Sequence, residues 1–175
     1  MTKGTKAFRI IISALLAFTM IISVFFIVVF CRIFQRTPFR IYVAGVAVNR
    51  SNEDDVFGDG TVYYDVYNNI LTFNNATIES EDWPLYSKKD LNIELIGENK
   101  LVCNKKEYSA GIYAGDNNLG KDLAITGDGS LAIEIPDKCG EAVGIFASKL
   151  TVTTDIIVKT PDCENKVHGI VCDSS

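Results

Sequence analysis

Two short sequence patterns recur through most of the chain after residue 70, and they constrain its fold more than any other feature. The first pattern starts with leucine and alternates apolar with polar residues. Its copies begin at Leu71, Leu91, Leu123 and Leu150, which lie 20, 32 and 27 residues apart. The second pattern is a Gly-Ile pair with apolar neighbours. Its copies lie at Gly111, Gly144 and Gly169. The two patterns together predict a parallel β solenoid, because each coil of a solenoid supplies short strands that stack on those of the next coil.

The alternation also predicts which side chains fill the interior of the coils. The expected interior residues are Leu91, Ile93, Leu95 and Leu101, then Leu123, Ile125, Leu131 and Ile133, and then Leu150, Val152, Ile156 and Val158. An antiparallel sandwich is the alternative, since its short strands and frequent turns look similar locally. A sandwich does not explain the recurring Gly-Ile pair, so the solenoid is the favoured prediction.

Turn residues and the two ends of the repeat region complete this picture. Gly, Asp and Asn mark turns at residues 57–60, 68–69 and 127–129, where positive φ is normally encoded. Residues 39–48 alternate weakly and predict an opening strand or hairpin. The sequence given stops just after the third Gly-Ile pair. We therefore expect the solenoid to end in mid-repeat. Two interpretations are open: the chain is a truncated form of a longer repeat protein, or its open C-terminal coil self-associates.

Residues 10–31 are 22 consecutive residues without charge, proline or glycine. As a helix they would be roughly 33 Å long, which matches the hydrocarbon thickness of a bilayer. We predict one transmembrane helix that acts as an uncleaved signal anchor. The expected domains are a short cytoplasmic N-terminus (1–9), the anchor (10–31), a linker (32–40) and the β-solenoid ectodomain (41–175). The predicted location is the cell membrane, with a single pass and the ectodomain outside the cytoplasm.

A cleaved signal peptide is the alternative to an anchor, because Lys3, Lys6 and Arg9 form a basic segment ahead of the apolar run. The run is long for a signal peptide, and no small-x-small cleavage site precedes Arg32. Basic residues are balanced on the two sides of the run, so charge alone does not orient it. The nine-residue N-terminal side and the strand-rich C-terminal side favour a cytoplasmic N-terminus.

The charge distribution excludes one class of partner. Residues 1–40 hold six basic and no acidic side chains, so the rest of the chain has 11 basic and 22 acidic residues, a net charge of about −11. Nucleic-acid binding depends on basic patches that displace counterions. We therefore expect no nucleic-acid partner, whereas an acidic surface suits cations, neutral sugars or a basic protein.

The five cysteines do not form a metal motif. They are Cys31, Cys103, Cys139, Cys163 and Cys172. None has CxxC spacing, and His168 is the only histidine, so a zinc site is not predicted. Disulfides remain an alternative, but small buried hydrophobic residues are the favoured interpretation of scattered cysteines in a repeat.

Three segments, 41–46, 55–65 and 71–78, together with the later repeats, resemble secreted surface modules of anaerobic Gram-positive bacteria. The resemblance covers about residues 40–175, although this chain is shorter than typical members and lacks their C-terminal coils. Those modules are typically right-handed parallel β-helices and are often labelled carbohydrate-binding domains. The resemblance therefore implies a right-handed solenoid and a glycan ligand.

Carbohydrate binding needs aromatic ring faces surrounded by hydrogen-bonding groups. The candidate ligand-binding residues are Trp83, Tyr86, Tyr108 and Tyr113. Structural packing is the alternative role for each of them, since Tyr113 aligns with Phe146 and Trp83 precedes a proline. The predicted partners are thus the membrane, through residues 10–31, and a polysaccharide.

An enzyme is the rival class, because polysaccharide lyases and hydrolases share the β-helix fold. A glycoside hydrolase needs two carboxylates flanking the scissile bond. The candidates are Asp116, Asp122, Asp128 and Asp155, but turn formation beside Gly and Asn explains them more simply. His168 occupies the place of Ala110 and Val143 in the repeat, and no nucleophilic triad accompanies it.

Calcium is the remaining cofactor to consider. Glu53, Asp54 and Asp55 are adjacent, and Asp116 follows Gly115, but no EF-hand or RTX spacing is present. We predict no catalytic residues, no metal and no cofactor. The favoured function is a non-enzymatic, membrane-anchored surface protein that binds glycan or mediates adhesion. The alternatives are a degenerate or partial polysaccharide lyase or hydrolase, and a structural element that assembles through its open coil end.

Overall fold

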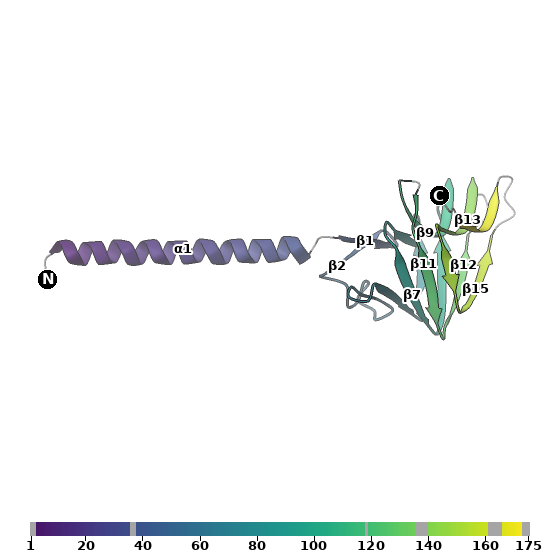
Figure 1. The fold of residues 1–175 in the computed structure, drawn as a ribbon, viewed down its shortest axis with the longest axis horizontal. Coiled ribbons are helices and arrows are strands. Elements are labelled where there is room, and N and C mark those ends of the chain that lie inside the picture. Colours follow the sequence, from purple (N-terminus) through teal and green to yellow (C-terminus); the bar gives the residue numbers. More distant parts are fainter. Residues whose placement is uncertain (1–2, 36–37, 118, 136–139, 161–165, 173–175) are drawn as a thin grey trace. The chain divides into compact units, whose positions relative to one another are not determined.

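The computed structural model describes residues 3–35, 38–117, 119–135, 140–160 and 166–172, and it divides the chain into two units, Met1–Thr37 and Pro38–Ser175. Two of the five cysteines, Cys139 and Cys163, lie outside the described residues, so their predicted burial is not addressed. Each unit is described by itself (Figure 1).

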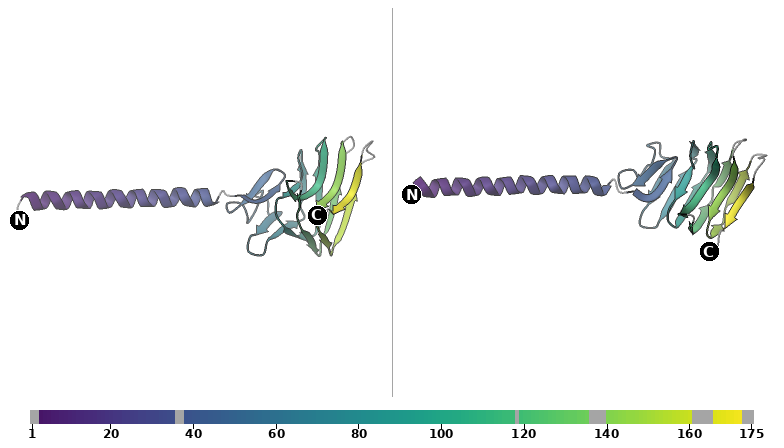
Figure 2. Two further views of the ribbon diagram at one scale, coloured as in Figure 1. Left: turned by 45° about the horizontal axis from the view of Figure 1, so that its top comes forward. Right: turned by 90° about the horizontal axis from the view of Figure 1, so that it is seen from above.

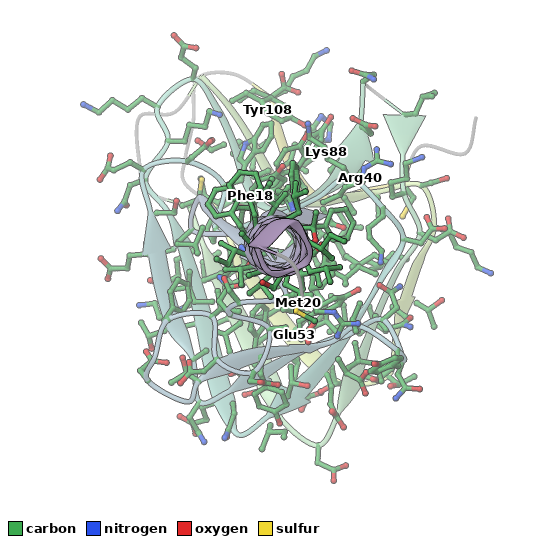
Figure 3. The ribbon with its side chains drawn as sticks, turned by 90° about the vertical axis from the view of Figure 1, so that its left-hand side faces the viewer. Phe18, Met20, Arg40, Glu53, Lys88 and Tyr108 are labelled. Atoms are coloured by element: carbon green, nitrogen blue, oxygen red, sulfur yellow. The ribbon has the colours of Figure 1, made fainter. Side chains whose placement is uncertain are left out.

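The first unit is a single helix, α1 (Lys3–Gln35). Its segment Ile12–Phe30 is long and apolar enough to cross a membrane. Large apolar side chains on this segment are exposed, and Phe18 and Met20 project outward from the helix in Figure 3. The helix is longer than the predicted span of residues 10–31 and extends to Gln35, within the predicted linker 32–40. No glycine or proline interrupts residues 32–35, and β1 (Pro38–Val43) begins soon afterwards.

The described residues of the second unit form strands in three sheets. Sheet A contains β2 (Val46–Asn49), β1, β6 (Leu85–Ser87), β9 (Tyr108–Asp116), β13 (Glu141–Ala147) and β16 (Val167–Cys172), in that spatial order, with β10 (Leu119–Gly120) paired to β9. Sheet B contains β3 (Val62–Asp65), β4 (Ile70–Asn74), β7 (Leu91–Ile96), β11 (Leu123–Gly127) and β14 (Leu150–Val152). Sheet C contains β5 (Thr77–Ser80), β8 (Glu98–Cys103), β12 (Ser130–Glu134) and β15 (Asp155–Lys159).

Strands from successive repeats lie side by side and parallel (Figure 2). Leu123 is in register with Leu91 on one side and with Leu150 on the other. In sheet A, Ile145 is in register with Ile112 and Ile170, so the Gly-Ile pairs are aligned as the sequence predicts. The sheets are mixed, however, because β1 pairs antiparallel with β2 and β6, β3 with β4, and β10 with β9.

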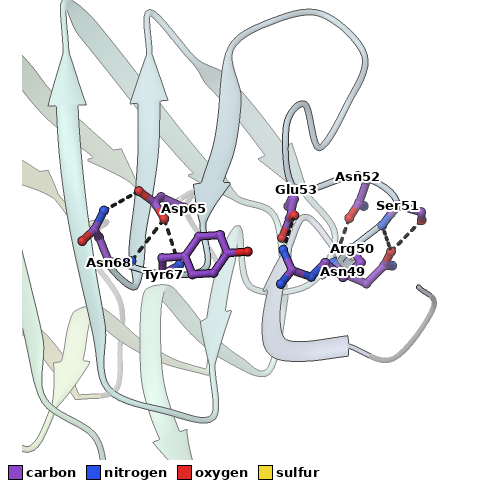
Figure 4. Close-up of polar contacts among 8 residues, drawn as sticks. All are labelled: Asn49, Arg50, Ser51, Asn52, Glu53, Asp65, Tyr67 and Asn68. Atoms are coloured by element: carbon purple, nitrogen blue, oxygen red, sulfur yellow. Dashed lines mark hydrogen bonds and ion pairs between the residues drawn. The ribbon is translucent and has the colours of Figure 1, made fainter. Parts of the chain in front are cut away.

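Three of these antiparallel pairs, β1–β2, β1–β6 and β3–β4, belong to the N-terminal part of the second unit. The predicted opening hairpin is confirmed as β1 and β2, joined at Ala44 and Gly45, which both have positive φ. Side chains stabilise the turns that follow. Figure 4 shows an ion pair of 2.7 Å between Arg50 and Glu53, and the Asp65 carboxylate accepting the backbone N–H groups at positions 67 and 68.

The core consists of the inward side chains of the repeats. All eight predicted interior residues of the first two coils are at most 2% exposed. The third predicted coil differs, because Leu150, Ile156 and Val158 are only partly buried and Val152 is 40% exposed. The prediction that Val152 is interior is therefore wrong, since no strand in the described part of the chain covers the far side of β14.

The predicted alignment of Leu71 with Leu91 is shifted by two residues. Leu71 is in register with Ile93 instead of Leu91, and Leu101 is in register with Ile133. The position opposite Leu131 is Asn99, which is only 3% exposed. Its amide nitrogen donates to three backbone carbonyls, those of residues 96, 97 and 130, and its oxygen accepts the N–H of Ala76. A buried amide thus replaces an apolar side chain at this corner and satisfies backbone groups of three consecutive repeats.

Close packing requires two of the three glycines of the Gly-Ile pairs, Gly111 and Gly144. A Cβ on Gly144 would collide with the carbonyl oxygen of Gly169 and with the side chain of Val158. A Cβ on Gly111 would collide with Ile133 and with the carbonyl oxygen of Gly144. A Cβ on Gly169 would have no atom within 4 Å.

The free cysteines divide between core and surface. Cys103 is buried, as predicted for a small hydrophobic residue, and burial raises the pKa of its thiol. Cys172 is exposed on β16, so the prediction that it is buried is wrong.

Candidate functional site

An aromatic row crosses the outer face of sheet A. It contains Tyr42 on β1, Tyr86 on β6, Tyr113 on β9 and Phe146 on β13, and each residue is in register with the next. Successive side chains of a strand point to opposite faces. The neighbours of these aromatic residues along each strand are buried, so the rings lie on the outer face and are half-buried themselves.

The rings of the row contact one another across the strands. Tyr113 stacks on Phe146 with centroids 4.7 Å apart and planes 10° apart. Tyr86 stacks on Tyr42 at 5.7 Å, and it meets Tyr113 edge-on at the same separation. Such contacts between neighbouring strands stabilise the sheet.

Trp83 packs on this row from the segment that leads into β6. Its indole ring stacks on Tyr113 at 4.4 Å and meets Tyr86 edge-on at 5.1 Å. Its Nε1–H donates to the backbone carbonyl of Tyr108 at 3.1 Å, and the ring of Tyr108 meets the indole edge-on. The indole is therefore held in one orientation by both packing and a hydrogen bond.

A lysine lies over the same indole ring. Lys105 Nζ is 4.2 Å from the centroid of the Trp83 ring and 2.6 Å from a carboxylate oxygen of Asp82. Tyr113 covers one face of the indole, so the ammonium group covers the other face. This is a cation–π contact supported by an ion pair.

The hydroxyls of Tyr108 and Tyr113 stay protonated at neutral pH. Burial raises the pKa of Tyr108 to about 12. Burial also raises the pKa of Tyr113. Each neutral hydroxyl can donate one hydrogen bond and accept others, as the hydroxyl groups of a sugar also do.

The four ligand-binding candidates from the sequence thus lie together in one cluster. Trp83, Tyr86, Tyr108 and Tyr113 come from the β6 and β9 regions, which are neighbours in sheet A. Both faces of the Tyr113 ring are occupied, by Trp83 and Phe146, so only its edge and hydroxyl are open to a ligand.

Sequence reasoning missed three members of the cluster. Tyr42 and Phe146 belong to the row, and Lys105 covers the indole. The alignment of Tyr113 with Phe146 was the signal that could have found the row, because aligned residues of a repeat lie next to each other. No pattern in the sequence indicates that Lys105 reaches Trp83.

The carboxylates considered for catalysis are dispersed. Asp116 pairs with Arg40 at 2.6 Å, and Asp155 is exposed at the start of β15. Asp128 lies in the turn between β11 and β12, and Asp122 lines a polar groove beside Asp90. His168 is in register with Val143, as the repeat predicts.

Among the side chains that the structure describes, no group of three or more His, Cys, Asp or Glu residues is placed to hold a metal ion. The acidic segment near Asp55 has a structural role. The Asp55 carboxylate accepts the backbone N–H groups of Gly58, Asp59 and Gly60, which fixes the turn before β3.

No family model matches this chain, and neither a curated protein nor a solved structure matches it significantly.

Proposed function

We propose that this chain is a membrane-anchored, non-enzymatic surface protein that binds glycan through the aromatic cluster around Trp83. The observation that carries the proposal is the convergence of Trp83, Tyr86, Tyr108 and Tyr113 on one outer surface of sheet A. Aromatic rings with neighbouring polar groups are the usual components of a sugar site.

The fold assigned in this proposal is a short right-handed parallel β solenoid. It is supported by the parallel, in-register stacking of β4, β7, β11 and β14 in sheet B and of β5, β8, β12 and β15 in sheet C. The antiparallel strands at the N-terminal end then close the first coil. The resemblance to secreted bacterial surface modules is part of the same proposal.

The proposed anchor is α1, uncleaved, with the second unit outside the cytoplasm. Its support is a helix that is continuous from Lys3 to Gln35 and apolar throughout Ile12–Phe30. A cleaved signal peptide would release the second unit instead. The apparent mass of the mature chain in its native membrane distinguishes the two.

Binding in this proposal occurs on the outer face of Trp83. A pyranose ring stacks on an indole through its C–H groups, and this is the face that Lys105 Nζ covers. The lysine must therefore move aside, after which the tyrosine hydroxyls can exchange hydrogen bonds with the sugar hydroxyl groups. The net acidic second unit favours a neutral glycan over an anionic one.

The test is a screen of the full chain in detergent against immobilised neutral and acidic glycans, with the fluorescence of Trp83 as an independent readout. Trp83 is the only tryptophan, so its emission reports on this site alone. We expect Trp83→Ala to abolish binding and Lys105→Ala to strengthen it, because the alanine uncovers the indole.

Tyr67→Ala is the matched control, since Tyr67 is 86% exposed and lies in a turn away from the row. It should bind as the unchanged chain does. Failure to bind any glycan would overturn the proposed function, and so would binding that persists in a folded Trp83→Ala variant.

A further inference from the structure

The strand β15 is an edge of sheet C in the described part of the chain, and its outer face is exposed. It pairs with β12 on one side only. Its outward side chains are Asp155, Ile157 and Lys159, and Ile157 is 61% exposed. A regular edge strand with an exposed large apolar side chain is a template for pairing with another strand.

The backbone groups of β15 that pair with no other described strand can be assigned. The carbonyl of Lys159 accepts the N–H of Ile135 at 3.1 Å, so the backbone groups of Lys159 face β12. Because these groups alternate along a strand, those of Ile157 and Asp155 also face β12. The N–H and C=O groups of Ile156 and Val158 therefore face away from the sheet.

The sequence of β15 is complementary to itself in antiparallel orientation. If Ile157 lies opposite Ile157 of a second copy, Asp155 lies opposite Lys159 and Ile156 lies opposite Val158. The hydrogen-bonding residues Ile156 and Val158 then face each other, as an antiparallel ladder requires. Opposite charges meet on the outer face, and directly opposed pairs of this kind are stabilising.

We propose that two copies of this chain associate through β15, paired antiparallel about a two-fold axis at Ile157. The inference is independent of the glycan-binding proposal, because it concerns sheet C and not the aromatic cluster of sheet A.

Charge and packing around β15 support a second copy as the occupant. Lys100 and Lys159 both pair with Glu134, at 2.7 and 3.1 Å, so positive, negative and positive groups alternate across β8, β12 and β15. The partner's Asp155 would continue this alternation. On the inner face, Ile156 and Val158 pack on the core but are incompletely buried, and the same residues of the partner would cover them.

The symmetry of the contact limits the assembly to a dimer. An isologous contact uses the same strand on both copies, so it closes after two subunits and leaves no edge for a filament. A contact between β15 and the opposite edge strand, β5, would instead be head-to-tail, and it would allow further copies to add without limit.

The experiment measures the mass of the full chain in detergent as a function of concentration, by light scattering after size exclusion. We expect a dimer for the unchanged chain. Asp155→Lys places two lysines opposite each other at both ends of the contact, and Lys159→Asp places two aspartates there. Each variant alone should raise the dissociation constant about tenfold or more.

Mixing the two variants in equal amounts decides the register. In a mixed dimer both outer pairs are again oppositely charged, so the mixture should regain the dimer that each variant loses. A structural defect in either variant would not be repaired by mixing. Glu79→Lys on β5 is the matched control, since it reverses one exposed charge in the same sheet and should leave the dimer unchanged.

Three outcomes would overturn the proposal. The first is a monomeric unchanged chain at all concentrations. The second is a dimer whose dissociation constant is unchanged by either charge reversal, which is the result expected if the copies associate through α1. The third is a mixture of the two variants that behaves as the separate variants do.

Discussion

The indole ring of Trp83 lies parallel to the phenol ring of Tyr113, with centroids 4.4 Å apart and planes 11° apart. Trp83 precedes β6 and Tyr113 lies in the middle of β9, so the stack joins two consecutive repeats on the outer face of sheet A. The same stack occupies one face of the indole and leaves the other to Lys105.

Replacing Trp83 by alanine should lower the free energy of unfolding by about 2 kcal/mol. The variant loses ring contacts with three tyrosines and the hydrogen bond to the Tyr108 carbonyl, but the indole is only half-buried, so the loss is smaller than for a core tryptophan. Urea unfolding followed by circular dichroism measures it.

Trp83→Phe is the control for this prediction. It keeps a stacking ring and loses only the Nε1–H donor, so it should lose less than half as much stability. An alanine variant as stable as the unchanged chain would show that the stack is a surface contact that does not contribute to the free energy of unfolding.

Much of the core and of the aromatic cluster could be predicted from the sequence, because equivalent residues of successive repeats occupy equivalent positions in the fold. The Leu-x-Ile segments identify the inward side chains of two repeats, and the aligned Gly-Ile pairs identify neighbours in sheet A. The aromatic candidates cluster for the same reason, since Tyr86 and Tyr113 occupy equivalent positions on adjacent strands.

What sequence reasoning missed depends on contacts that are not repeated. Asn99 is a buried polar residue opposite Leu131, where the repeat pattern would place an apolar side chain. Lys105 reaches Trp83 from a loop whose conformation no periodicity encodes. Val152 fits the repeat pattern but is exposed, because its burial would need a further strand.

Replacing Asn99 by alanine should cost about 2–3 kcal/mol of stability. The Ala76 N–H would lose its acceptor, and three backbone carbonyls would lose a donor at a position that is closed to water. The midpoint of urea unfolding should fall, with an unchanged slope, if the fold is retained.

Asn99→Asp separates the two roles of the amide. It keeps an acceptor for Ala76 but places a carboxylate against the three carbonyls, so at neutral pH it should be at least as destabilised as Asn99→Ala. Stability equal to that of the unchanged chain would mean that the donor side of the amide is unimportant.

The glycines of the Gly-Ile pairs offer a paired test of packing between repeats. Gly144→Ala should destabilise the fold by about 3 kcal/mol or more, because the new Cβ would collide with the backbone of Gly169 as well as with Val158, and backbone does not move aside cheaply. Thermal unfolding of the purified variant measures the effect.

Gly169→Ala is the matched control on the next strand. Its Cβ would have no atom within 4 Å, so the change should stay within about 0.5 kcal/mol. Equal losses in the two variants would contradict the view that crowding between strands is the reason for the glycine at position 144.

The ion pairs of Glu134 should make part of the stability depend on pH. Hydrogen bonds from Lys100 and then from Lys159 hold the pKa of this carboxyl below its ordinary value of 4.5. A carboxyl with a lowered pKa in the folded state stabilises the fold above its unfolded pKa, and this contribution is lost as the pH falls through the folded pKa.

The unchanged chain should therefore unfold at a higher urea concentration than Glu134→Gln at pH 7, and the difference should shrink as the pH falls below 4.5. Because the group is at the surface, salt should reduce the difference as well. Glu79→Gln, which removes one exposed carboxylate of the same sheet, is the control for the loss of a surface charge. A difference between Glu134→Gln and the unchanged chain that is constant from pH 7 to pH 3 would show that packing of the side chain, and not its charge, is responsible.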